Sequence, residues 1–190
     1  MFIMSSIQLG LCCLNTKLRD QKPTVFMSRS MIQKTMEQED GIEIAKERSL
    51  ENISDIKTMI DWNIENNINV MRLSSNIFPH LSNWKMTKCE SPIDPSEFSE
   101  YQSLEWCIEE LQDIGKYAND RKHRLTFHPG QYNQVGAKTR EVYEKTILDL
   151  GLHAKIFDIM GMGDDSIMVI HGGGVYGNKG ETIDRWKRQF

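Results

Sequence analysis

Short apolar segments alternate along the chain with longer stretches of helical periodicity, and this alternation constrains the fold more than any other feature. Each short segment is followed at once by polar residues or glycine, as is typical of buried strands. Strands that alternate with helices pair in parallel, and the helices form right-handed crossovers between them. The sequence therefore predicts an α/β fold with a parallel sheet, whose four strands cover Ile7–Cys13, Asn69–Leu73, Arg124–Phe127 and Ser166–Ile170.

Three stretches between these strands carry apolar residues at helical spacing, namely Leu50–Ile64, Leu104–Ile114 and Arg140–Met160. Two others, Thr16–Gly41 and Leu81–Ser99, lack this pattern, and we interpret them as irregular segments rather than domain linkers. The pattern alone fits an open, doubly wound sheet of four or five strands. A closed (β/α)₈ barrel typically needs about 250 residues.

Composition restricts the protein's environment and its partners. The formal net charge of −4 excludes a global basic field that would attract nucleic acid, so such contacts need a local basic patch. None of the four cysteines forms a CxxC pair, and we interpret them as core thiols in a reducing compartment. No secretory signal is evident, and no apolar run approaches the ~20 residues of a membrane span. The sequence therefore predicts a soluble, intracellular protein with no membrane partner.

Three of the five histidines closely follow predicted strands: His80, His128 and His171. In parallel α/β folds, functional groups gather at the carboxyl ends of the strands. Neutral imidazole is the commonest metal ligand among protein side chains, so rings from several strands can converge on one ion. After His128, Pro129 stops strand pairing and Gly130 allows a tight bend. The set of three histidines indicates a metal site.

Simpler interpretations stay open for each of these features. A single histidine at a strand end is more often a satisfied hydrogen-bonding group than a ligand. The glycines Gly172, Gly173 and Gly174 allow backbone to approach a phosphate closely, but such a run is usually only a turn. His123 lies at the opposite end of its strand and His153 within a helical pattern, so we interpret both as structural, with an indirect role in the site as the alternative for His153.

Gln131 and Tyr132 follow the bend and are expected to be exposed. An exposed aromatic ring beside an amide can stack on a nucleobase and hydrogen-bond to its edge. A lid that packs on a neighbouring loop is the equal alternative. No Asp or Glu directly follows any of the four strands, although multinuclear sites for phosphodiester cleavage use bridging carboxylates. Either the site is mononuclear or its carboxylates come from elsewhere.

Several segments together resemble the UV damage endonuclease family: "LGLCCLNTKLR", "SRS", "NISDIKTMIDWNIENNINVMRLSSNIFPHLSN", "RLTFHPGQYNQVG", "LDLGLHAKIFDIMG" and "VIHGGGVYGNKGETIDRW". The resemblance extends from about residue 7 to residue 186. It implies a (β/α)₈ barrel with divalent, manganese-like ions at its mouth. The implied reaction is hydrolysis of the DNA phosphodiester 5′ to a UV photoproduct or another distorting lesion, which opens an alternative excision repair pathway.

The resemblance also implies roles for individual residues. His128 and His171 match metal ligands, and His80 matches a histidine near the metal. Gln131 and Tyr132 match residues that wedge into damaged double-stranded DNA. Asn15 matches a polar residue near the lesion.

This chain departs from the family in two respects. Leu11 stands where many relatives have an aromatic residue, and the sequence ends before the later strands that carry carboxylate ligands in the family. The resemblance therefore implies that residues 1–190 form one partial barrel domain with about the first four βα units, the N-terminal half only. Two alternatives stay open: a metal-dependent sugar isomerase-like barrel, and an inactive fragment or half of a split enzyme that binds a complementary C-terminal half or forms an aberrant oligomer.

Overall fold

The computed structural model of the chain describes residues 7–22, 25, 29–87 and 91–190. A three-stranded parallel sheet forms its centre, with β1 (Gly10–Cys12), β2 (Val70–Leu73) and β3 (Arg124–Phe127) in that order. In β2 and β3, half-buried and buried residues alternate along the strand. The buried positions lie in the hydrophobic core, and the intervening ones lie on the opposite face. The predicted α/β class with parallel strands is confirmed.

The predicted fourth strand, Ser166–Ile170, is not a strand in the structure. It forms a single parallel bridge between Phe127 and Met168, where the Phe127 amide donates to the Ile167 carbonyl and the Val169 amide donates to the Phe127 carbonyl. Pairing stops there because β3 ends at Phe127 and Pro129 has no amide hydrogen to donate. The segment nevertheless runs along β3 in the position of a fourth strand.

The first predicted strand was too long, because Ile7 and Leu9 are exposed and β1 begins only at Gly10. Its cysteines also differ from the prediction of core thiols. Cys12 is exposed and Cys13 half-buried, whereas Cys107 is buried; Cys89 lies outside the described residues. The position of Cys12 on the open face of a short edge strand accounts for its exposure.

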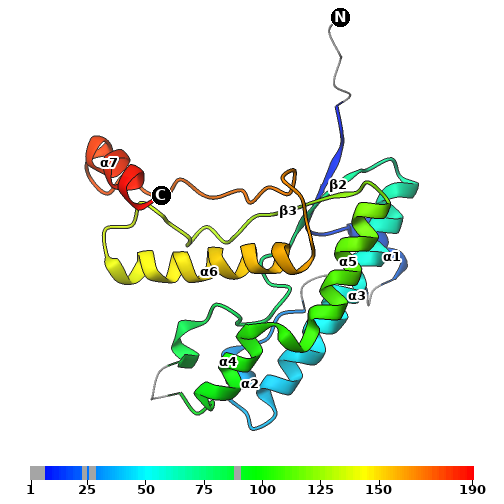
Figure 1. Ribbon diagram of the computed structural model, residues 1–190, viewed down its shortest axis with the longest axis horizontal. Helices are drawn as coiled ribbons and strands as arrows, with labels where there is room; N and C mark the ends of the chain where they lie inside the picture. The colour runs from blue at the N-terminus through cyan, green and yellow to red at the C-terminus, as the bar shows by residue number, and fades with distance from the viewer. Residues whose placement is uncertain (1–6, 23–24, 26–28, 88–90) are drawn as a thin grey trace, which may run out of the picture.

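Helices cover the core face of the sheet. The long helix α3 (Gly41–Glu65) follows β1 and packs beside α5 (Ile108–Asp120), which follows β2 (Figure 1). Helix α6 (Arg140–Ile159) follows β3 and contacts α5. The last helix, α7 (Lys179–Gln189), lies by the N-terminal end of α6, far from α3 and α5 (Figure 1). Among the described helices, none is long and apolar enough to cross a membrane.

The two stretches expected to be irregular contain short helices. Thr16–Gly41 includes α1 (Thr16–Gln21) and α2 (Gln33–Met36), and α3 already begins at Gly41. Leu81–Ser99 includes η1 (Trp84–Thr87) and the start of α4 (Pro95–Ser103). The predicted helical stretch Leu104–Ile114 begins with the short η2 (Glu105–Cys107), which leads into α5. Most of these elements are too short to show a helical period in sequence. Local caps hold α1 and α4 instead, such as the Asp94 carboxylate that accepts from the Ser96 amide.

Helix α6 buries less of its apolar face than its pattern predicts. Ile156 and Phe157 are buried, whereas Val142, Ile147 and Leu148 remain exposed. The N-terminal half of α6 extends beyond the sheet, away from α3 and α5 (Figure 1). It therefore projects past the carboxyl ends of the strands, where the loops after β2 and β3 lie.

Candidate active site at the carboxyl ends of the strands

His128 and His171 lie together, although a whole βα unit separates them in sequence. His128 directly follows Phe127, the last residue of β3, and His171 directly follows the segment that pairs with Phe127. Their ring centroids are 4.5 Å apart, and the rings are inclined by 56°. Both residues are half-buried. Two neighbouring backbone segments thus bring two imidazoles together at the carboxyl end of β3.

The surroundings of His128 favour its neutral ring. Burial lowers the pKa of His128 below its ordinary value, and the positive charges of Arg72 and, when protonated, His171 act in the same direction. A neutral imidazole keeps the nitrogen lone pair that a metal ion needs. His128 therefore keeps the lone pair that a ligand needs, and metal binding by the pair stays a prediction.

Arg72 is the site residue that the sequence did not reveal. It lies in β2 with Cys12 and Thr126 as its partners on either side, and its Nε donates to the Cys13 Sγ at 3.3 Å. The alternation of β2 could have revealed it. Met71 and Leu73 face the core, so Arg72 between them faces the other side of the sheet. The positive charge of Arg72 beside two candidate metal ligands would repel a metal ion unless anions, either carboxylates or a phosphate, lie nearby.

The bend after His128 differs from expectation in one detail. Gly130 does not have the positive φ that only glycine adopts easily, and a Cβ added there would meet nothing within 4 Å. The turn is held by Asn133, whose amide nitrogens, backbone and side chain, both donate to the Gly130 carbonyl. The bend therefore needs Pro129 and Asn133 more than it needs a glycine at 130.

Of the three glycines that directly follow His171, only Gly173 has a conformation that favours glycine, with φ of +78°. All three, Gly172, Gly173 and Gly174, are exposed. Their backbone is thus open to a ligand, and close approach of a phosphate stays a prediction.

Gln131 and Tyr132 are exposed, as predicted, and 81% of the surface of Tyr132 is accessible. The next residue, Asn133, is buried and donates to the Asp149 carboxylate of α6 at 2.6 Å. Tyr132 borders a cavity of about 790 Å³ between α6 and the loop after β2. The turn that carries the exposed pair is thus anchored to α6, and base stacking by the pair stays a prediction.

His80 differs from His128 and His171 because both of its ring nitrogens are hydrogen-bonded to protein groups. Its Nε2 donates to the Met31 carbonyl at 2.7 Å, which leaves Nδ1 to accept from the Asn83 side chain at 3.2 Å. Both ring nitrogens are therefore occupied by protein groups. A direct catalytic role for His80 would require one of these bonds to open.

Asn15 caps a helix. It is 4% exposed, and its Oδ1 accepts from the Leu18 amide at 2.8 Å, while its Nδ2 is buried with no hydrogen-bond partner in the described structure. Contact with a lesion would need that amide to become accessible. Leu11 packs against the hydrophobic core.

The remaining histidines are buried in structural positions. His153 Nδ1 donates to the Asp149 carbonyl at 2.7 Å, and its ring meets Phe127 edge-on. His123 accepts from the Asn63 side chain at 3.2 Å, and burial lowers its pKa to about 4. Both fit the structural interpretation.

A complete metal site is not present in the described part of the chain. No group of three or more His, Cys, Asp or Glu side chains in it could hold a metal ion together. His128 and His171 thus form a pair without a third ligand there.

Comparison with known proteins decides the family. The sequence profile of the family described as UV-endonuclease UvdE matches residues 7–190. The chain belongs to the UvdE family. A protein of Acanthamoeba polyphaga mimivirus, provisionally named a UV-damage endonuclease, is 38% identical over 97% of this chain and 52% of its own length. The UV-damage endonuclease of Schizosaccharomyces pombe is 35% identical over 96% of this chain and 29% of its own length.

The fold of this UvdE member is likewise similar to a solved structure. The crystal structure of SacUVDE superposes with a TM-score of 0.79 at 23% identity, over 97% of this chain and 55% of that one. The chain therefore spans about half the length of the mimivirus relative and of SacUVDE. The suspected family is confirmed, and the sugar isomerase alternative has no support from these relatives.

Proposed function

We propose that the chain supplies the first four βα units of a (β/α)₈ barrel and the imidazole part of its nuclease site. The observation that carries this proposal is the His128–His171 pair, whose ring centroids lie 4.5 Å apart in a chain of the UvdE family. The exposed turn with Gln131 and Tyr132 follows His128 directly in sequence. The proposed reaction is hydrolysis of the DNA phosphodiester 5′ to UV photoproducts and other distorting lesions. It would begin an alternative excision repair pathway within the cell.

A divalent cation such as Mn²⁺ fits this pair as an incomplete ligand set. Two imidazoles lie with their centroids 4.5 Å apart, and burial lowers the pKa of His128, which favours its neutral form. When bound, such an ion supplies activation of water and stabilisation of charge on the phosphate. We assign the missing ligands to carboxylates from outside the described residues, which would also balance the charge of Arg72.

Damaged duplex DNA fits the exposed turn. Tyr132 presents an aromatic face to solvent, and such faces stack on bases without regard to sequence. Bases at a distorting lesion already stack poorly, so opening the duplex there costs less than the few kcal/mol of normal steps. We therefore assign Gln131 and Tyr132 to holding the distorted duplex open.

The proposed partner of the chain is a complementary C-terminal half. In the described structure no strand pairs with the outer edge of β1, and the 166–170 segment pairs with β3 through a single bridge. Ile167, Val169 and Val175, in and after that segment, expose apolar surface. Such edges pair with other strands or cause aggregation. A free chain that sediments as a stable monomer would contradict the partial-barrel interpretation.

Binding to defined DNA tests the proposed substrate directly. Fluorescence anisotropy of the 190-residue chain with a duplex that carries one cyclobutane dimer should show tighter binding than with the same duplex undamaged. Equal affinity for the two duplexes would contradict the assignment. The comparison needs no metal, so it separates recognition of the lesion from cleavage.

A further inference from the structure

Helix α7 joins the two loops that begin at His128 and His171. The Trp186 Nε1 donates to the Gly172 carbonyl at 2.9 Å, and the Arg185 Nε donates to the Gly136 carbonyl at 2.8 Å. Gly172 directly follows His171, and Gly136 lies in the loop between β3 and α6. Two consecutive side chains of one helix therefore hold one loop each.

The indole of Trp186 also packs against Gly136 so closely that no larger residue fits there. A Cβ added at Gly136 would lie 2.4 Å from the Cδ1 atom of Trp186. Gly136 is buried and does not have a positive φ. The need for glycine at this position therefore comes from the indole and not from the backbone conformation.

Helix α7 is itself fixed near both ends. At its start, the Asn178 side chain accepts from the Glu181 amide, and the Thr182 hydroxyl lies within hydrogen-bond distance of the Val175 carbonyl. At its end, the Tyr143 hydroxyl of α6 donates to the Gln189 carbonyl at 3.0 Å. Arg185 and Trp186 thus project from a helix that is anchored to the loop before it and to α6.

We propose that Arg185 and Trp186 are positioning residues for the histidine pair. Arg185 holds the loop at Gly136 and Trp186 holds the loop at Gly172, both against α7. The two contacts thereby set the separation of these loops and the spacing of the His128 and His171 rings. Neither residue needs to touch a ligand. Only the consequence for metal binding rests on the proposed function, because the geometric part concerns the protein alone.

The spacing of the rings can be measured without metal or DNA. In the full 190-residue chain labelled with ¹³C-histidine, the ring protons of His128 and His171 should give a nuclear Overhauser cross-peak, since their centroids are 4.5 Å apart. Trp186→Phe removes the indole donor and keeps an aromatic ring. Gly136→Ala forces the indole away. Both variants should lose the cross-peak.

Matched variants separate positioning from general stability. Gly151→Ala should keep the cross-peak, because a Cβ there meets nothing within 4 Å. Combining Gly136→Ala with Trp186→Ala should cause no more loss than Trp186→Ala alone, because the clash needs both partners. If Gly136→Ala does not fold, as shown by thermal unfolding, Trp186→Phe and Arg185→Gln decide the question.

An unchanged cross-peak in folded Trp186→Phe and Arg185→Gln would overturn the proposal. Loss of the cross-peak in these variants while Gly151→Ala retains it would support it. A wild-type chain that shows the cross-peak but gives no Mn²⁺ effect at either ring would count against the metal part of the proposed function alone. The two failures are therefore distinguishable.

Discussion

The imidazole rings of His128 and His171 lie with their centroids 4.5 Å apart, each at the point where its backbone segment leaves the sheet. This closeness predicts that Mn²⁺ affects both rings together. Paramagnetic broadening by Mn²⁺ should remove the ring signals of His128 and His171 at lower concentrations than those of the buried His123 and His153. In His171→Ala, the affinity at His128 should fall by more than the roughly 10–100-fold that loss of an outer-shell partner costs. Independent broadening of the two rings would contradict a shared ion.

Substitution of Tyr132 should weaken recognition of damage and leave the metal pair intact. Its ring is exposed and free to stack on a base, which contributes about 1–3 kcal/mol. Tyr132→Ala should therefore lose roughly 5–150-fold in affinity for a dimer-containing duplex. Tyr132→Phe retains the aromatic face and serves as the matched control. A fall in Mn²⁺ affinity of Tyr132→Ala, with lesion preference unchanged, would show that the wedge assignment is wrong.

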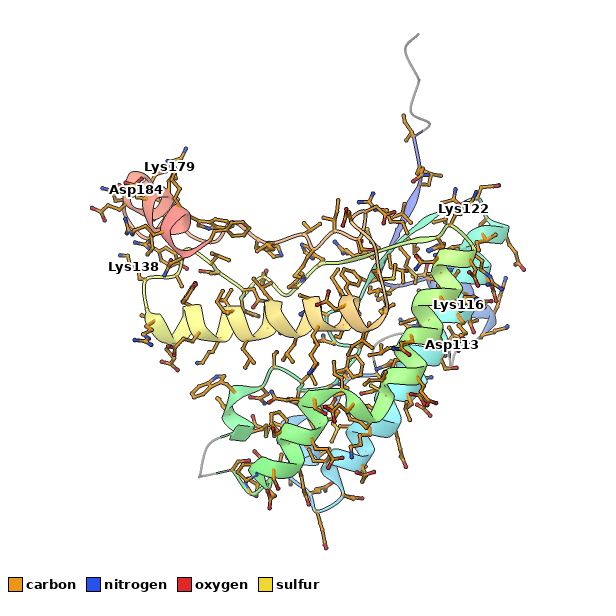
Figure 2. All side chains as sticks on the ribbon, in the orientation of Figure 1. Asp113, Lys116, Lys122, Lys138, Lys179 and Asp184 are labelled. Carbon is orange, nitrogen blue, oxygen red and sulfur yellow. The ribbon has the colours of Figure 1, made fainter. Side chains whose placement is uncertain are left out.

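Two exposed lysines near α7 are expected to contact DNA phosphates. Figure 2 shows Lys138 and Lys179 at the α7 end of the molecule, whereas Lys122 lies at the opposite end beside α5. Within the described residues, none of the three forms an ion pair. Lys138→Ala and Lys179→Ala should each lower DNA affinity equally for damaged and intact duplex, and reduce the salt-dependence slope by about 1. Lys122→Ala should leave the slope unchanged; an equal effect there would indicate only a general charge effect.

The buried His123 makes stability depend on pH. Its pKa falls from 6.5 in the unfolded chain to about 4 in the folded protein, because burial opposes its charge. Between these values the unfolded state binds the proton that the folded state excludes. The free energy of unfolding should therefore fall as pH drops from about 6.5 to 4, by on the order of 3 kcal/mol.

Urea unfolding at several pH values measures this loss. His123→Gln should be less stable at pH 7, because the bond to Asn63 changes, but should lose less stability on acidification than the wild type. Parallel curves for the two proteins across this window would mean that His123 does not control the acid response.

The sequence was most informative where local pattern and tertiary packing agree. Strand β3 has the predicted bounds because its alternation is read directly from Leu125 and Phe127, which face the core. The closeness of His128 and His171 followed from the shared edge of parallel strands. The irregular reading of Thr16–Gly41 failed, because α1 depends on the Asn15 cap rather than on periodicity.

Other features could not be predicted from spacing. The pairing of the 166–170 segment stops after one bridge because its register places it opposite Pro129, and register depends on the whole sheet. The occupied nitrogens of His80 arise from a contact with Met31, which is distant in sequence. The packing of Trp186 on Gly136 likewise joins residues from separate elements, and neither a tryptophan nor a glycine in the sequence indicates such a contact.

The most direct measurement is nicking by a chimera that joins this chain to the segment following the matched region of the mimivirus relative. That segment would supply the carboxylates proposed for the ligand set. On UV-irradiated supercoiled plasmid with Mn²⁺, the chimera should convert supercoiled DNA to the nicked form, with undamaged plasmid left intact. His128→Ala and His171→Ala should each abolish this conversion. Undiminished, metal-dependent nicking by either variant would contradict the central claim that these two imidazoles form part of the nuclease site.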